Sequence, residues 1–370
     1  MVTVIIFLIV LAVLIFVHEL GHFLFAKMFG IRVDAFKIGF GPKIFAWKRG
    51  ETEYGLNLIP FGGYVKIFGE NPDAESTLGV DSKRSMVHKA KWQQVVVLVG
   101  GVLFNVLFAF ILYVGLFSHG VAATDDSFSG YSQYFSNPRI MVTDVIKDSP
   151  AEKAGLKVGD VILAVNMASS TTFAPRKETV TDIQSTISES KGSLIDVTYE
   201  RSGDIEDTTA VPASGLVDGK YAIGIAMDNV MDMQLPFFTA IYEGAHYTVN
   251  TFKETVTGLY GFVSQIFHGK ADLSQVTGPV GIAGIVGSAA RLGFTYLLMI
   301  TALISINLAV INLIPFPALD GGRIFFLLIE AIIRRPIPPK FANGVNLIGF
   351  GLLMLLMVVI TYKDIIKLFQ

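Results

Sequence analysis

The first apolar run of the chain contains three ionisable side chains, and this restricts what the chain can fold into. From Met1 to Val17 the only polar side chain is Thr3; His18-Glu19-Leu20-Gly21-His22 follows, and four more apolar residues continue the run. A stretch of this length and polarity predicts a transmembrane helix over residues 1–27. Ionisable groups inside such a helix are costly to bury unless they have specific partners.

The spacing of the two histidines supplies a reason to bury them. Residues four apart lie on one face of a helix, so His18 and His22 could share a metal ion. Glu19 follows the first ligand directly and could act as the catalytic base, taking a proton from the water that the metal activates. The alternative is a helix face whose histidines hydrogen-bond to neighbouring helices. A third ligand in another apolar segment would favour the metal site.

A candidate third ligand stands in the third apolar run, within Asn312-Leu313-Ile314-Pro315-Phe316-Pro317-Ala318-Leu319-Asp320-Gly321-Gly322. The two prolines should break the helix there. Asp320 adds an anionic oxygen to two imidazoles and leaves a fourth position for water. Zn²⁺ suits this set best, although cobalt or iron could use similar ligands. In the alternative, Asp320 caps a helix that begins near Ile324; it could also do both. Asn312, and Asn307 on the same span, could hydrogen-bond a substrate backbone.

Composition places the chain among polytopic α-helical membrane proteins with a soluble portion. Of its 370 residues 52% are hydrophobic and 16% charged, and a net charge of -2 argues against nucleic acid as a partner. The chain has no cysteine, so His, Asp or Glu must hold any metal. We expect four transmembrane helices in the following order: 1–27, the first helix with HExxH; 28–93, a membrane-associated β-hairpin segment; 94–118, the second helix; 125–230, an inserted α+β domain; 234–290, an amphipathic membrane-surface segment; 291–333, the third helix; 345–366, the fourth.

The segment 28–93 is unusually apolar for a loop. Alternating residues and glycine punctuation predict short β-hairpins, with Gly62-Gly63 at a turn or bulge, followed by Tyr64. The segment could be a small cytosolic hairpin. It could equally be a sheet edge near the metal, where Gly62, Gly63 and Tyr64 would hold a substrate strand by backbone pairing. In the second helix, Asn105 is interpreted as a residue that joins helices.

The inserted domain carries a recognisable pattern. The stretch from Ser149 to Asn166 resembles the core of a PDZ domain, with a short helix that ends at Gly155 and a turn at Gly159-Asp160 into a strand. By that resemblance, one strand over Tyr221–Ile225 would close the domain, and Ala222, Ile223, Gly224 and Ile225 would line a peptide groove. Alternatively, the domain acts only as a steric plug.

The distribution of positive charge predicts the topology. Residues 27–93 contain eleven Lys and Arg, and the connection between the third and fourth helices is also basic. Both connections should therefore face the cytosol, with the two termini and the PDZ-like domain on the outer side. His18 would lie about 22 Å along its helix from Thr3, and so nearer the cytosolic face.

Taken together, these motifs resemble the site-2 proteases, a family of intramembrane zinc metalloproteases, in the bacterial PDZ-containing RseP/RasP-type branch. Phe61-Gly62-Gly63-Tyr64 and Gly278-Pro279-Val280-Gly281 add to the resemblance, which covers nearly the whole chain. It implies one Zn²⁺ per chain in a bacterial inner membrane. It also implies single-span substrates trimmed beforehand, such as anti-sigma factors and signal-peptide remnants, in regulated intramembrane proteolysis. The chain departs from the pattern in having room for one PDZ module, where some relatives have two, and in Gly100-Gly101-Val102, where relatives often have Gly-Pro.

Two other functions use the same features. A divalent-metal transporter would need further metal sites along a path and no base at Glu19. A membrane-tethered peptide receptor would need the PDZ-like domain but no intact metal triad.

Overall fold

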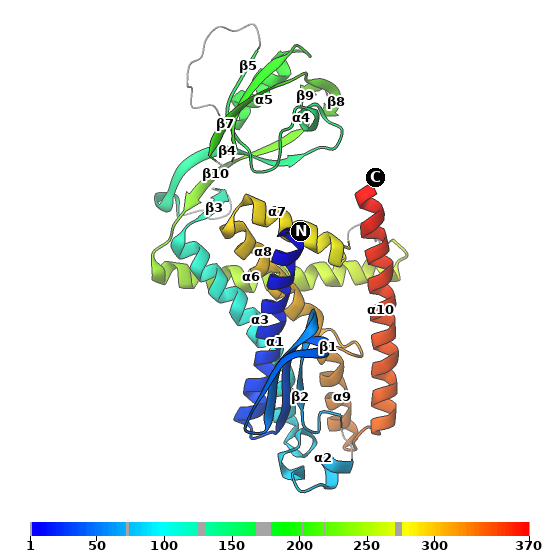
Figure 1. The fold of residues 1–370 in the computed structure, drawn as a ribbon. Coiled ribbons are helices and arrows are strands. Elements are labelled where there is room, and N and C mark those ends of the chain that lie inside the picture. The colour runs from blue at the N-terminus through cyan, green and yellow to red at the C-terminus, as the bar shows by residue number, and fades with distance from the viewer. Residues whose placement is uncertain are drawn as a thin grey trace. The chain divides into compact units, whose positions relative to one another are not determined.

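The computed structural model describes residues 2–71, 74–124, 131–167, 179–201, 203–217, 219–270 and 276–369. The chain forms two compact units (Figure 1). The first, called the helical unit, comprises Met1–Leu116 and Phe238–Gln370, and the second, called the inserted unit, comprises Phe117–Phe237.

Four helices among the described residues are long and apolar enough to cross a membrane, as predicted: α1 (Val2–Met28), α3 (Lys91–His119), α8 (Phe294–Leu313) and α10 (Pro339–Phe369). The predicted third span is two helices, because the chain leaves the helical conformation at Ile314 and resumes it in α9 (Asp320–Ile333). This break agrees with the prediction from the two prolines.

Small residues bring these helices together. A Cβ on Gly21 of α1 would lie 2.1 Å from the carbonyl oxygen of Gly100 on α3, so the two backbones touch. In the same way Gly287 of α7 (Pro279–Leu292) receives the Thr3 side chain. Such contacts are the usual basis of helix packing in lipid, where apolar side chains gain little by leaving one apolar environment for another.

The segment predicted to lie on the membrane surface, 234–290, contains α6 (Phe237–Phe267) and α7. Thr248 and Thr251 of α6 are buried together with Ala240, whereas Phe238, Tyr260 and the charged Glu254 are exposed. The exposed surface is therefore mixed, and its aromatic side chains are suited to contact with lipid. The surface position itself remains a prediction.

Two long, bent strands form the predicted hairpin region, β1 (Val33–Arg49) and β2 (Thr52–Ile67). Residues 35–38 of β1 pair with 53–56 on one side and with 63–66 on the other, because β2 turns back on itself. Gly62, at this turn, has φ +111°, a conformation that favours glycine. The result is a small sheet in which 63–67 is one edge and 43–49 the other.

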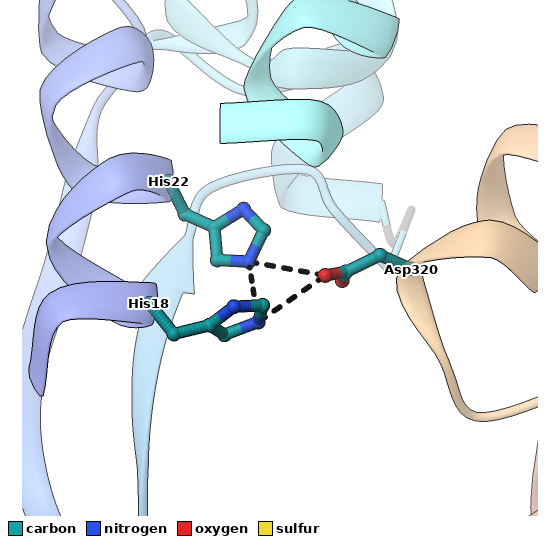
Figure 2. Close-up of side chains that lie close together, drawn as sticks. All are labelled: His18, His22 and Asp320. Carbon is teal, nitrogen blue, oxygen red and sulfur yellow. Dashed lines mark hydrogen bonds and ion pairs between the residues drawn. The ribbon is translucent and has the colours of Figure 1, made fainter. Parts of the chain in front are cut away.

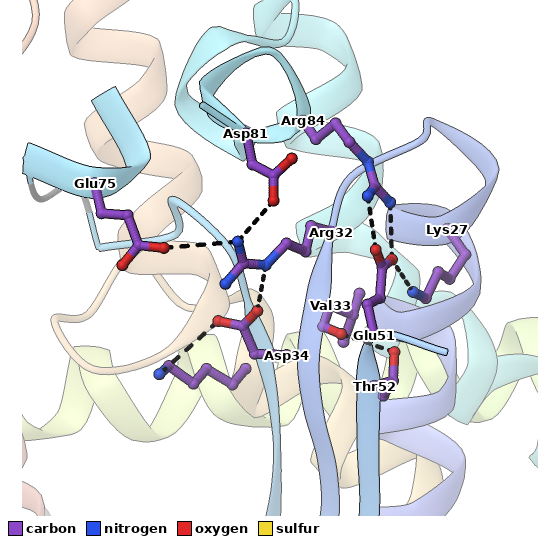
Figure 3. A network of polar contacts seen from close by, with 10 residues as sticks. Lys27, Arg32, Val33, Asp34, Glu51, Thr52, Glu75, Asp81 and Arg84 are labelled. Atoms are coloured by element: carbon purple, nitrogen blue, oxygen red, sulfur yellow. Dashed lines mark hydrogen bonds and ion pairs between the residues drawn. The ribbon is translucent and has the colours of Figure 1, made fainter. Parts of the chain in front are cut away.

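An ionic network anchors this sheet to the end of α1 (Figure 3). Glu51 accepts a 2.6 Å hydrogen bond from Lys27 Nζ and lies 2.7 Å from Arg84 Nη1. Together, Arg84 and Lys27 lower the pKa of the Glu51 carboxyl to about 2. The buried Thr52 hydroxyl donates to the carbonyl of Val33 at 2.7 Å. Three short helices then lead from β2 to α3: α2 (Ala74–Leu78), η1 (Ser82–Arg84) and η2 (Met86–His88).

The inserted unit is a six-stranded sheet in the order β3-β10-β4-β5-β6-β7, with a separate β8-β9 pair. Its elements are β3 (Val121–Thr124), η4 (Ser132–Tyr134), β4 (Phe135–Val145), α4 (Pro150–Lys153), β5 (Val161–Met167), α5 (Val180–Glu189), β6 (Ile195–Arg201), β7 (Asp204–Ala210), β8 (Ala213–Val217), β9 (Lys220–Ala222) and β10 (Ile225–Met233). The unit is larger than the predicted 125–230 because β3 pairs with the end of β10. Residues 125–130, 168–178, 202 and 218 of that prediction lie outside the described residues.

The local pattern around α4 agrees with the prediction. Ser149 caps α4, Gly155 follows it with φ +83°, and β5 starts after Gly159 and Asp160. Asp160 is buried and receives two hydrogen bonds from Arg201, of 2.7 and 2.6 Å.

The prediction of one strand over Tyr221–Ile225 is wrong. β9 ends at Ala222, Gly224 takes φ +86°, and β10 starts at Ile225. The chain bends because Ile223 enters the core, where its carbonyl accepts from Ala151 N, while Gly224 O accepts from Ile146 N. The Ile223 side chain is therefore unavailable to line a groove, whereas Ala222 and Ile225 are half-buried.

Candidate metal centre

Three side chains that are far apart in the sequence converge in the helical unit (Figure 2). Asp320 Oδ2 lies 3.3 Å from His18 Nε2 and 3.3 Å from His22 Nε2, and the two nitrogens are 3.2 Å apart. Asp320 Oδ2 is buried, with no hydrogen-bond partner among the residues described. Within those residues this is also the one group of three side chains that could hold a metal ion.

These distances fit zinc. Ligand atoms about 2.0–2.1 Å from a tetrahedral zinc ion are about 3.3 Å from one another. Three nitrogen and oxygen atoms at this mutual spacing form one face of such a tetrahedron and leave its fourth corner open. An open corner is the feature that distinguishes catalytic from structural zinc sites.

The helix break carries Asp320 to this point. Its two glycine neighbours permit the fold: a Cβ on Gly321 would lie 2.3 Å from Ile314 O, and one on Gly322 would lie 2.2 Å from Phe316 O. The proline-containing loop therefore lies directly on the first turn of α9. Asp320 is the first residue of α9, and no side chain caps that helix, so the alternative role as a cap is not observed.

Glu19 faces the edge of the small sheet. Its Oε2 accepts a 2.9 Å hydrogen bond from Val65 N, a backbone donor on the edge formed by 63–67. Gly63, on the same edge, packs against α1. A Cβ on Gly63 would lie 3.7 Å from Glu19 Cγ and 2.8 Å from Ile15 Cγ2. The predicted base and the predicted substrate-binding edge therefore adjoin each other, next to the metal ligands.

The other predicted site residues differ in position. Tyr64 stacks on Phe40 at 6.2 Å between ring centres, and Gly62 leaves space for that ring. Asn307, predicted to hydrogen-bond a substrate, instead accepts at Oδ1 a 3.1 Å hydrogen bond from Thr255 on α6 and so joins two helices. Asn312 is half-buried in the last turn of α8.

Sequence reasoning missed the part played by α3. Val97 O lies 2.9 Å from His22 Nδ1, and Asn105 Nδ2 lies 3.2 Å from His18 Nδ1. Between them, a Cβ on Gly101 would lie 2.4 Å from His22 Nε2. The sequence did contain a signal, because these three residues are spaced by four and so share one face of the helix. The middle residue is small, and the third is polar although it lies inside an apolar span.

Comparison with known proteins identifies the family. Residues 6–356, which include all three converging side chains, match the model of peptidase family M50. The chain belongs to peptidase family M50. A protein of Clostridium perfringens described as a zinc metalloprotease is 37% identical over 354 residues, 95% of each chain. The zinc metalloproteases RasP of Shouchella clausii and Geobacillus kaustophilus are 31% and 30% identical, covering 100% and 98% of this chain and 100% and 97% of their own.

Membership of family M50, the site-2 proteases, makes the chain a zinc metalloprotease. The four apolar helices make it one that is integral to a membrane. Its cofactor is zinc, and the His18, His22 and Asp320 cluster has the composition and spacing that zinc requires.

Proposed function

We propose that this family M50 protein is an intramembrane endopeptidase that cuts the transmembrane segments of single-span membrane proteins. The proposal rests on one observation: a zinc-sized cluster and the Glu19 carboxylate lie beside a strand edge that packs on the apolar helix α1. A cleavage site placed among apolar helices suits a substrate that is itself apolar.

In this proposal His18, His22 and Asp320 hold the zinc ion. Zinc supplies a Lewis acid that polarises the scissile carbonyl and makes water nucleophilic near neutral pH. Glu19 takes the proton from the attacking water and then delivers it to the leaving amine. Val65 N holds the Glu19 carboxylate in place by its hydrogen bond.

A transmembrane substrate is helical, and its backbone groups are already hydrogen-bonded to one another. It must unwind before a peptide bond becomes accessible. The edge at Gly62, Gly63 and Tyr64 would hold the unwound stretch as an added strand, while Val65 N stays bonded to Glu19. Asn312 and Asn307 are additional candidates for substrate hydrogen bonds, Asn307 by exchanging its bond to Thr255.

We further propose that the inserted unit is a PDZ domain that acts as a size filter. The turns around α4 and the open side of β10 support the PDZ assignment. Residues 225–229 pair with β4 on one side, whereas β3 pairs on the other side only from Val230 on, as far as the described residues extend. That free edge, next to Ala222, Gly224 and Ile225, could take a peptide strand.

The proposed setting is the bacterial inner membrane, with the termini and the PDZ domain outside and the metal site near the cytosolic face. The basic residues of 27–93 support this orientation. The expected substrates are proteins whose outer domain has been removed beforehand, such as anti-sigma factors, and signal-peptide remnants. The process would then be regulated intramembrane proteolysis.

The test is cleavage of a single-span reporter in liposomes, with bound zinc measured in each variant. Glu19→Gln should keep its zinc and lose cleavage, and Glu254→Gln, an exposed carboxylate on α6, should behave as wild type. A wild-type protein that binds zinc and cuts no reporter, with Glu19→Gln identical to it, would point to a transporter or peptide receptor instead. Deleting residues 125–230 should speed the cleavage of untrimmed substrates; an unchanged rate would refute the filter.

A further inference from the structure

One face of α3 lies against both histidines of the metal site. Val97, Gly101 and Asn105 are each four residues apart and so share that face. Val97 O contacts His22 Nδ1, and the Asn105 side chain contacts His18 Nδ1. Gly101, between Val97 and Asn105, leaves room for the two imidazole rings. The Asn105 side chain is fully buried.

The contact of His22 determines its tautomer. A carbonyl oxygen can only accept a hydrogen bond, so His22 Nδ1 must carry the proton that it donates to Val97 O. The lone pair of a neutral imidazole is then on Nε2, the atom that points at Asp320. His22 is thereby held in the form in which it binds a metal.

His18 needs the same arrangement, because Nε2 is also its converging atom. Its partner is an amide, which offers an oxygen or an NH₂ group according to how it is turned. Asn105 directs Nδ2 at His18 Nδ1, while Oδ1 is buried with no hydrogen-bond partner among the residues described. With zinc on Nε2, Nδ1 carries a proton, and two donors would face each other.

We propose that Asn105 is a positioning residue for the zinc ligand His18. In the zinc-loaded protein its amide is turned so that Oδ1 accepts from His18 Nδ1–H. α3 then supplies an acceptor to each histidine, Val97 O to His22 and Asn105 Oδ1 to His18. Outer partners of this kind fix the ring orientation and raise the basicity of the ligand nitrogen.

The backbone of Asn105 has a second connection. Its carbonyl accepts a 2.8 Å hydrogen bond from the buried Ser305 hydroxyl on α8, the helix that leads into the loop before Asp320. Asn105 thus contacts His18 of α1 through its side chain, and through its backbone it contacts α8, the helix before Asp320. Ser305→Ala removes the second contact only, which makes it a matched control for helix packing.

The inference rests on His18 being a ligand, as proposed above, and its test does not need cleavage. Zinc affinity of the full chain in detergent is measured by competition with a chromophoric chelator. Asn105→Leu, similar in size but without an acceptor, should weaken zinc binding by about 10- to 100-fold. Asn105→Asp, whose carboxylate can only accept, should restore it to within about threefold, and Ser305→Ala should stay within that range.

Wild-type protein with ¹⁵N-labelled histidine supplies a second readout, and it does not depend on whether a variant folds. In the zinc-loaded state His18 should carry its proton on Nδ1. An unprotonated Nδ1 would overturn the inference. Wild-type affinity in Asn105→Leu would do so too, as would an equal loss in Asn105→Leu and Asn105→Asp. If His18→Ala retains wild-type affinity, the ligand assignment has failed instead.

Discussion

Replacing Gly101 with alanine should abolish tight zinc binding and leave the chain folded. The added Cβ would lie 2.4 Å from His22 Nε2 and 2.7 Å from His18 Cε1, whereas carbon and nitrogen atoms in contact are normally more than 3 Å apart. One ring must therefore move by most of an ångström. Zinc ligands tolerate about 0.2 Å, so at least one imidazole is lost.

The loss of zinc affinity should exceed the 10- to 100-fold expected when an outer hydrogen-bond partner is removed, since here a direct ligand is displaced. Overpacking should lower the free energy of unfolding of the metal-free protein by about 1–3 kcal/mol. Zinc affinity by chelator competition and thermal unfolding with excess chelator measure the two effects separately.

Gly115→Ala is the matched control. Gly115 lies on the same helix and has nothing within 4 Å of an added Cβ, so it should retain wild-type affinity and gain up to about 1 kcal/mol of helix stability. If Gly101→Ala binds zinc as tightly as Gly115→Ala, then α3 does not approach the two imidazoles as described.

Three further predictions concern other parts of the chain. Gly321→Ala should weaken zinc binding by about tenfold or more in the same titration, since its Cβ would push the proline loop away and move Asp320; unchanged affinity would contradict this. Arg201→Met should destabilise the inserted unit by up to about 3–5 kcal/mol, because the buried Asp160 loses its charged partner and keeps the hydrogen bond from Lys157 N; limited proteolysis of the full chain should then cut within 117–237. Acid should weaken the anchoring of the small sheet, because the pKa of Glu51 in the folded protein is about 2 against an ordinary 4.5. Its ion pairs therefore contribute about 1–2 kcal/mol to the free energy of unfolding above pH 5, and this contribution is lost as the pH falls toward 2. Thermal unfolding across that range should show the loss, and Glu51→Gln should remove the part that Glu51 contributes, leaving the part from Glu53, whose pKa Lys43 and Lys37 also lower to about 2.

The sequence was sufficient to predict features that depend on local spacing. The four-residue separation of His18 and His22, and the helix break before Asp320, follow from helix geometry and from proline. Hydrophobicity alone indicated the four membrane helices. In each case the signal lies within about one turn or one span.

Features that depend on how distant segments meet could not be predicted. Asn105 was interpreted as a residue that joins helices, because nothing in its own span shows that it lies opposite His18, 87 residues away. The hydrogen bond from Val65 N to Glu19 requires the register of the whole sheet. Ile223 looked like part of a continuous strand, and only the core that it fills shows why the strand ends before it.

The contact between Gly21 and Gly100 has a consequence for how the enzyme tolerates different membranes. Helices adapt to a thicker or thinner bilayer mainly by tilting. With backbone against backbone, α1 and α3 cannot come closer, and separating them would open the packing around His22. α10 buries little of its surface, but Gly349 packs against Pro317 and Asn346 Oδ1 accepts from Ala318 N, so its tilt is coupled to the loop before Asp320. The packing of α3 on His18 and His22 should therefore be insensitive to lipid chain length, and any change of zinc affinity between short-chain and long-chain lipids should arise at Asp320.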